Sequence, residues 1–184
     1  MDGAKQAKGE EVQDERYARV AASYGPALER LARAYEADPD QRLDLLQDIH
    51  FAIWRSFAQF DDRCSERTWV YRVAHNAATS HMLRRRRQTS ERLATLDELA
   101  AHPDPAELTP ETEAGERQAL ARLMALIHAL APADRQVVLL YLEGLDAGAI
   151  GEVCGLTPGA VAMKVHRLKA MLSQRFSQGG SHAG

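Results

Sequence analysis

Two short basic segments are the parts of this sequence best suited to chemistry with a polyanion. Residues 67–87 carry six arginines and no acidic side chain, and residues 159–176 carry four basic side chains and no acidic one. Clustered lysine and arginine side chains attract phosphate groups even in a chain whose net charge is −3. The charge pattern therefore predicts polyanion binding at two separate places. For either segment alone, a solvated helix face is the alternative.

The second basic segment follows residues that are typical of a helix-turn-helix. Asp146 can cap a short helix, and Thr157 followed by proline is a strong start signal for the next one. Gly155 suits the left-handed geometry of a tight turn, and Gly151 is small enough for two helices to cross closely. We expect the second helix, over 157–172, to enter the major groove of DNA. An ordinary helical hairpin without a DNA role is the alternative.

Helical periodicity covers both halves of the chain. In the first half we expect helices over 24–35, over 43–57 and from 69 into the arginines. In the second half we expect helices over 120–130, 137–142, 146–154 and 157–172. Pro26 stands near the start of the first helix, where its missing N–H costs little, and Gly144 ends the helix over 137–142. No alternating strand pattern is present.

Residues 88–118 separate the two halves. They carry eight acidic and two basic side chains together with Pro103, Pro105 and Pro110, and they lack sustained apolar periodicity. Such a composition favours an extended, poorly ordered connector, with at most a short helical turn around 93–99. The predicted fold class is therefore all-α, with two helical domains joined by an acidic, proline-containing linker.

The sequence shows no pattern typical of an enzyme active site, a metal site or a membrane-spanning segment. Cys64 and Cys154 make neither a disulfide framework nor a zinc site, and any redox role for them stays open. His75 and His81 are six residues apart, which is not the spacing of two metal ligands on one helix face. No secretory signal or bilayer-length apolar segment is found. We expect a cytoplasmic protein without catalytic residues, metal, cofactor or membrane insertion.

Three segments together carry a resemblance to a known family. Residues 44–54 read DLLQDIHFAIW, residues 67–76 read RTWVYRVAHN, and residues 130–135 read LAPADR. In this order, with the helix-turn-helix after them, they resemble the sigma-70 family of RNA polymerase sigma factors, in its extracytoplasmic-function group. The resemblance implies a region 2-like domain over 20–88, a linker over 89–118 and a region 4-like domain over 119–176. We expect disordered tails over 1–19 and 177–184.

The resemblance also implies a function and a role for individual residues. The chain would bind core RNA polymerase, recognise the −10 and −35 promoter elements and help to open the DNA. The residues that match the polymerase-docking helix are Asp44, Gln47 and Asp48. The residues that match the −10 segment are Arg63, Arg67, Trp69, Arg72, His75, Asn76, Arg84, Arg85, Arg86 and Arg87. The residues that match the −35 helix are Thr157, Gly159, Lys164, Arg167 and Lys169.

The sequence differs from the family pattern in the −10 loop and in the helix-turn-helix. Asp61, Asp62 and Glu66 lie in or beside the −10 loop, where negative charge opposes DNA binding. Gly151 replaces the more usual alanine, which lowers helix propensity by up to about 1 kcal/mol. A free-standing helix-turn-helix regulator is the alternative function. The resemblance also makes an anti-sigma protein a candidate partner, although the sequence does not reveal one.

Overall fold

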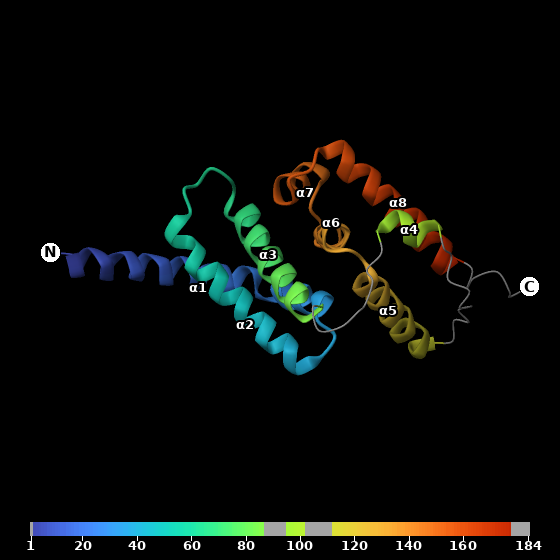
Figure 1. Ribbon diagram of the computed structural model, residues 1–184, viewed down its shortest axis with the longest axis horizontal. Coiled ribbons are helices and arrows are strands. Elements are labelled where there is room, and N and C mark those ends of the chain that lie inside the picture. The colour runs from blue at the N-terminus through green and yellow to red at the C-terminus, as the bar shows by residue number, and fades with distance from the viewer. Residues whose placement is uncertain (1, 87–94, 102–111, 178–184) are drawn as a thin grey trace, which may run out of the picture. The chain divides into compact units, whose positions relative to one another are not determined.

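The computed structural model describes residues 2–86, 95–101 and 112–177, and every regular element in these ranges is a helix (Figure 1). The chain divides into two units, Met1–Ser90 and Glu91–Gly184. The all-α prediction is confirmed. In the same described ranges, no helix is both long and apolar enough to cross a bilayer.

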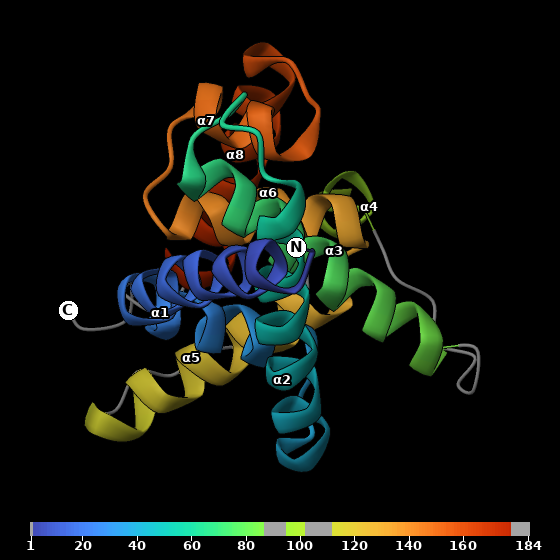
Figure 2. The ribbon, with the colours of Figure 1, turned by 90° about the vertical axis from the view of Figure 1, so that its left-hand side faces the viewer.

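The N-terminal unit is built from three long helices: α1 (Asp2–Tyr35), α2 (Pro39–Ser56) and α3 (Glu66–Arg86). A short 3-10 turn, η1 (Phe57–Gln59), follows α2. α2 packs against both other helices and α1 crosses it (Figure 2). Asp38 caps α2 by accepting hydrogen bonds from the backbone N–H groups of Asp40 and Gln41. The apolar stripe of α2 supplies the centre of the core with Leu45, Ile49 and Ile53, all fully buried.

α1 corrects two expectations about the start of the chain. The helix begins at Asp2, so the disordered tail predicted over 1–19 is wrong. The sequence there has no apolar stripe, but its polar side chains find partners on α2. Gln13 donates to the Trp54 carbonyl at 2.7 Å, and the Tyr17 hydroxyl pairs with His50 at 3.1 Å. Pro26 consequently lies inside α1 rather than near its start.

The C-terminal unit contains α4 (Leu96–Ala101), α5 (Thr112–Ala129), α6 (Pro132–Leu142), α7 (Ala147–Cys154) and α8 (Pro158–Ser177). α6, α7 and α8 pack on one another, and α5 packs on α6. Leu130, Leu140, Ile150, Val161 and Leu168 are fully buried among them. Asp146 caps α7 by accepting from the Ala149 N–H, and Thr157 caps α8 by accepting from the Ala160 N–H.

The segment predicted as a linker is partly helical. α5 begins at Thr112, and α4 lies along α8 (Figure 1). Leu96 is fully buried, and its N–H donates to the Asp134 carboxylate at 2.9 Å. The short helical turn expected around 93–99 corresponds to α4, which one apolar side chain and one backbone hydrogen bond hold within the C-terminal unit. The last residues of the predicted connector, from Thr112, belong to α5 instead. The remaining linker residues, 89–94 and 102–111, and the tail over 178–184 lie outside the described residues.

Candidate nucleic-acid interface

One face of α2 presents acidic and apolar side chains together to solvent. The predicted residues Asp44, Gln47 and Asp48 are all exposed. Leu43 and Phe51 lie on the same face, and they are 67% and 57% exposed. Neither was predicted, although the four-residue spacing from 43 through 47 to 51 places them on one helical stripe. Exposed apolar groups beside carboxylates suit docking of another protein.

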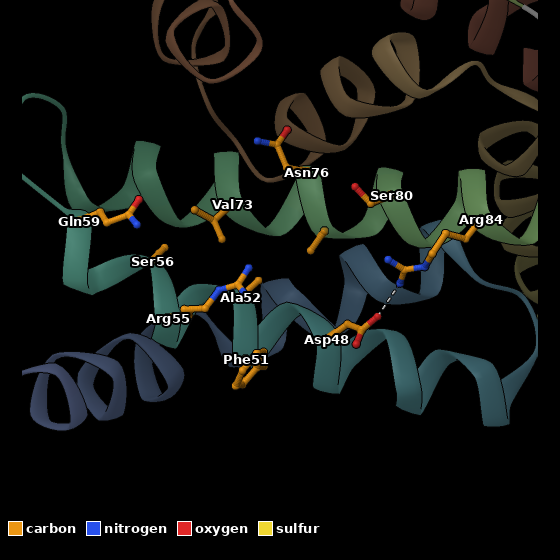
Figure 3. A pocket seen from close by; sticks show the side chains of 11 residues that line it. Asp48, Phe51, Ala52, Arg55, Ser56, Gln59, Val73, Asn76, Ser80 and Arg84 are labelled. Carbon is orange, nitrogen blue, oxygen red and sulfur yellow. Dashed lines mark hydrogen bonds and ion pairs between the residues drawn. The ribbon is translucent and has the colours of Figure 1, made fainter. Parts of the chain in front are cut away.

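A groove of about 730 Å³ runs between α2 and α3 (Figure 3). From α3 it is lined by Val73, Asn76, Ala77, Ser80 and Arg84, from α2 by Asp48, Phe51, Ala52, Arg55 and Ser56, and from η1 by Gln59. Figure 3 shows Arg84 reaching across the groove to Asp48, with 2.8 Å between the guanidinium nitrogen and the carboxylate oxygen. Both charges are half exposed or more, so this ion pair can exchange with outside partners at small cost.

The predicted −10 residues at the start of α3 lie in different environments. Arg67 and Asn76 are exposed, and the Arg67 guanidinium lies 5.9 Å from the centre of the Tyr71 ring. Arg72 is half-buried. Trp69 is also half-buried, because its indole N–H donates to the Ser56 hydroxyl at 2.8 Å and its ring packs on Phe60. The sequence placed all these residues along DNA, and the structure leaves Arg67 and Asn76 the most accessible.

His75 has to be removed from the predicted DNA contacts. Its side chain is 1% exposed, and its Nδ1 pairs with the Tyr35 hydroxyl at 3.1 Å. Burial lowers the pKa of His75 to about 3, so the imidazole is neutral at physiological pH. A neutral ring inside the core cannot contact phosphate. The sequence motif could not reveal this, because the partner Tyr35 lies 40 residues away on α1.

The arginine run at the end of α3 has intramolecular carboxylate partners in the described part. Arg85 pairs with the buried carboxylate of Glu36, and His81 Nε2 lies 3.7 Å from the same carboxylate. Arg84 pairs with Asp48, as above. The side chain of Arg86 and all of Arg87 lie outside the described residues. Arg85 therefore ties α3 to the end of α1 rather than facing a ligand.

The loop between η1 and α3 contains Asp61 and Asp62, and Glu66 begins α3; these are the acids whose charge opposes DNA binding. Its Arg63 is exposed, and the Arg63 guanidinium pairs with Asp61 at 2.5 Å. Asp62 has a φ of +57°, the only positive value at a residue other than glycine among the described residues. Aspartate tolerates this left-handed conformation better than most residues. The loop before α3 thus contains the Arg63–Asp61 ion pair and a left-handed backbone conformation at Asp62.

The exposed stripe of α8 differs from the predicted contact set. Thr157, Gly159 and Lys169 are exposed as predicted, and Met163 and His166 complete the stripe. His166 was missed, although three- and four-residue spacing from 159 through 163 to 166 would have found it. Lys169 also lies 5.3 Å above the Tyr141 ring. The stripe begins at the capped N-terminus of the helix, where backbone N–H groups face outward.

Lys164 and Arg167 face carboxylates of their own unit. Lys164 pairs with Asp134, whose side chain is almost fully buried, so it joins α8 to α6. The prediction that Lys164 contacts DNA is therefore corrected. Arg167 pairs with Asp97 of α4, and both of these side chains are largely solvent-accessible. Arg167 can still exchange its partner, because a surface ion pair is weak.

The described residues contain no group of three histidine, cysteine, aspartate or glutamate side chains that could hold a metal ion. Cys64 and Cys154 are both free. Burial raises the pKa of the Cys154 thiol to about 11, so this side chain stays protonated and unreactive at neutral pH. The chemistry of the described surface is therefore that of binding through arginines, acids and apolar side chains.

Comparisons with known proteins identify the families to which the two units are similar. Residues 20–88 match the family model Sigma-70 region 2, and residues 120–172 match Sigma-70, region 4. The RNA polymerase sigma factor CnrH of Cupriavidus metallidurans is 31% identical over 165 residues, which cover 85% of this chain and 84% of that protein. The ECF RNA polymerase sigma factor SigE of Mycolicibacterium smegmatis is 28% identical over 155 residues, 83% of this chain and 58% of that protein.

Two solved structures share the fold. One is the structure of CnrH in complex with the cytosolic domain of CnrY, with a TM-score of 0.64, 21% identity, and coverage of 93% of this chain and 94% of that one. The other is the sigma factor RpoE in complex with the anti-sigma factor NepR from Bartonella quintana, with a TM-score of 0.62, 19% identity, and coverage of 89% and 98%.

Proposed function

Because the chain belongs to the sigma-70 family of RNA polymerase sigma factors, we propose that its two helical units divide promoter recognition between them. The chain is a sigma factor: it binds core RNA polymerase, recognises −10 and −35 promoter elements and assists promoter opening. The free-standing regulator is not favoured, because residues 20–88 match region 2.

The exposed face of α2 is the proposed polymerase contact. Leu43 and Phe51 supply apolar area, and Asp44 and Gln47 supply polar contacts beside it. Burying an aromatic side chain at the centre of an interface contributes most of the affinity in many complexes, while surrounding polar groups set the orientation. A polymerase surface with basic groups around an apolar patch would complement this face. Asp48 has a smaller share, because Arg84 already occupies it.

The exposed side of α3 and the loop before it form the proposed −10 contact. Arg63 and Arg67 supply positive charge, and Asn76 supplies hydrogen-bonding groups at the edge of the groove. Unstacking a base costs a few kcal/mol, which contacts with the extruded strand must offset. The half-buried Trp69 and its neighbour Phe60 offer aromatic surface for such stacking. Arg72 and Arg84 are further candidates for phosphate contact.

The exposed stripe of α8 is the proposed −35 contact. Thr157 and Gly159 allow the N-terminus of the helix to approach the base edges, and Met163 and His166 follow one and two turns later. Lys169 is placed for phosphate, and Arg167 joins it when a phosphate replaces Asp97. Lys164 is left out because it belongs to the joint between α6 and α8.

We extend the proposal to the setting in which the factor works. One structural neighbour was solved with the anti-sigma factor NepR and the other with the cytosolic domain of CnrY, so we propose that an anti-sigma protein binds this chain too. Core polymerase and promoter DNA place the factor in the cytoplasm. Its contribution to initiation is binding and strand separation rather than catalysis of a reaction of its own.

Co-elution with core RNA polymerase on a sizing column tests the polymerase contact. We expect a stoichiometric complex with the wild-type chain, and loss of the complex with Asp44→Lys combined with Phe51→Ala. Glu15→Lys is the matched control, since it makes the same charge change at an exposed site on α1. No complex with the wild-type chain, while duplex DNA is still bound, would instead favour the free-standing regulator.

A further inference from the structure

The first half of α1 is fixed to the part of the molecule that carries the −10 loop. Residues 11–19 precede the region 2 match, which begins at residue 20. Besides the hydrogen bonds of Gln13 and Tyr17, Asp14 accepts one from the Trp54 indole N–H at 2.7 Å. These contacts place α1 beside the end of α2, where the loop begins. A segment outside the family match therefore borders a proposed promoter-binding surface.

Arg16 is the side chain through which α1 reaches that loop. Its guanidinium lies 4.8 Å from the centre of the Phe60 ring and 5.7 Å from that of Phe57. The same group lies 3.5 Å from the Asp62 carboxylate and 3.7 Å from that of Glu66. The Arg16 side chain is only 28% exposed, so these contacts are better shielded from solvent than those of an ordinary surface arginine.

These contacts change the charge of the loop. Asp61 already has Arg63 as its partner, which leaves Asp62 and Glu66 as the carboxylates that would repel a DNA strand. Arg16 lies within ion-pair distance of both. Arg19 also approaches Glu66, but at 4.0 Å and with its own side chain 64% exposed. One half-buried cation therefore offsets about half of the negative charge of the two remaining acids.

The same cation also supports the shape of the loop. Phe60 packs at 5.2 Å against Trp69 and at 6.2 Å against Phe57, so Arg16 covers a small aromatic cluster at the start of α3. Asp62, two residues after Phe60, has the positive φ described above. A residue held in a sparsely populated conformation persists only where its surroundings fix it. Arg16 contacts both the ring before this residue and its carboxylate.

We propose that Arg16 is a positioning residue for promoter opening, acting through the −10 loop. It holds Phe60 against Trp69 and offsets part of the negative charge of Asp62 and Glu66, so that a single DNA strand can approach the exposed side of α3. This role rests on the proposed −10 contact. It assigns to α1 a task in DNA recognition that lies upstream of the matched region, and it predicts no part for Arg16 in polymerase binding.

The test compares Arg16→Gln, Arg16→Lys and the control Arg19→Gln in the full chain bound to core polymerase. The probe is a fluorescein-labelled single strand, taken from the −10 region of promoters that the wild-type holoenzyme selects from a random library. We expect Arg16→Gln to weaken strand binding by about tenfold, as when a shielded cation over aromatic rings and carboxylates is removed. Arg16→Lys should lose less, because it keeps the charge without the flat guanidinium. Arg19→Gln should stay within about twofold of wild type.

Two further measurements separate this role from simple structural support. Uncompensated carboxylates repel DNA less as salt rises, so the defect of Arg16→Gln should be larger at 0.05 M than at 0.5 M salt. Adding Asp62→Asn and Glu66→Gln to Arg16→Gln should restore most of the strand binding. A defect that is independent of salt and resists this rescue would overturn the proposal.

The remaining outcomes also decide the matter. Wild-type strand affinity in Arg16→Gln, or an equal defect in Arg19→Gln, would overturn the role of Arg16 while leaving the proposed function intact. Reduced association of Arg16→Gln with core polymerase would show that Arg16 supports the whole unit rather than the loop. Failure of the wild-type holoenzyme itself to bind the strand would reject the proposed −10 contact, and the role of Arg16 with it.

Discussion

Replacing Gly151 with alanine tests the close approach of the two helices in the helix-turn-helix. A Cβ added at Gly151 would lie 2.5 Å from the carbonyl oxygen of Leu156, which belongs to the backbone of the turn. The Leu156 N–H in turn donates to the Gly151 carbonyl at 3.1 Å, so the turn is closed at this point. Nothing in this pair is a flexible side-chain end that could move aside. The backbone must therefore shift by about 1 Å to reach ordinary contact distance.

The expected magnitude follows from two opposing effects. Overpacking a tight site typically costs about 1–3 kcal/mol. Exchanging glycine for alanine inside a helix returns up to about 1 kcal/mol through helix propensity. A clash with backbone lies in the upper part of the overpacking range, so we expect Gly151→Ala to lower the unfolding free energy of the C-terminal unit by about 1–2 kcal/mol. Gly159→Ala is the matched control, because a Cβ there would meet nothing within 4 Å, and it should be neutral or stabilising.

The assay must report on the two units separately, because a two-unit protein does not unfold as one transition. Both tryptophans, Trp54 and Trp69, lie in the N-terminal unit, so their fluorescence follows that unit alone. Hydrogen exchange of α7 and α8 amides follows the C-terminal unit. Gly151→Ala should speed exchange in α7 and α8 and leave the fluorescence transition in urea unchanged. Equal or slower exchange than in wild type would refute the steric reasoning.

Three further predictions concern charge. Burial lowers the pKa of His75 to about 3, so the unfolded state binds a proton at higher pH than the folded state does. The unfolding free energy of the N-terminal unit should therefore fall by up to about 1.4 kcal/mol per pH unit as pH falls below about 6.5. His75→Gln should flatten this dependence in tryptophan-monitored urea denaturation. Asp97→Asn should free Arg167 and tighten binding to −35 duplex, measured by fluorescence anisotropy; unchanged affinity would contradict it. Lys169→Ala should reduce the salt slope of that binding by about 0.9, whereas Lys164→Ala should lower the thermal midpoint and leave the slope unchanged.

Local chemistry explains which parts of the fold could be predicted. The caps at Asp146 and Thr157 are confirmed because a short polar side chain and its N–H partner lie within three residues of each other. Gly144 and Gly155 have positive φ as expected, since few other residues tolerate it. Gly151 was expected to permit close helix crossing, and the short distance to Leu156 confirms this.

Long-range pairing explains what could not be predicted. The sequence predicts Lys164 and Arg167 as DNA contacts because it does not reveal their partners, Asp134 and Asp97, which lie 30 and 70 residues away along the chain. Helical periodicity gives the stripe on which a side chain lies, but not which stripe another helix covers. The same limit applies to Arg16, whose segment reads as a polar tail until α2 and the loop are folded beside it.

The packing of α4 on α8 also limits the reach of the chain between its two units. Ten residue steps join the end of α3 at Arg86 to the start of α4 at Leu96. A fully extended chain advances at most about 3.6 Å per residue, so this connector spans no more than about 36 Å. If α4 leaves α8, the connector runs on to the start of α5 at Thr112, and its limit rises to about 94 Å.

The two limits on the connector length can be compared with the distance between the promoter elements. The −10 and −35 elements are separated by about 25 base pairs, which is about 85 Å of straight duplex at about 3.4 Å per base pair. With α4 in place, the lengths of the two units themselves must cover more than half of that distance. α4 therefore limits how far apart the two promoter contacts can lie. The buried Leu96 and its hydrogen bond to Asp134 hold α4 in place, with a smaller contribution from the surface ion pair between Asp97 and Arg167. We expect this packing to narrow the range of spacings between promoter elements that the factor tolerates.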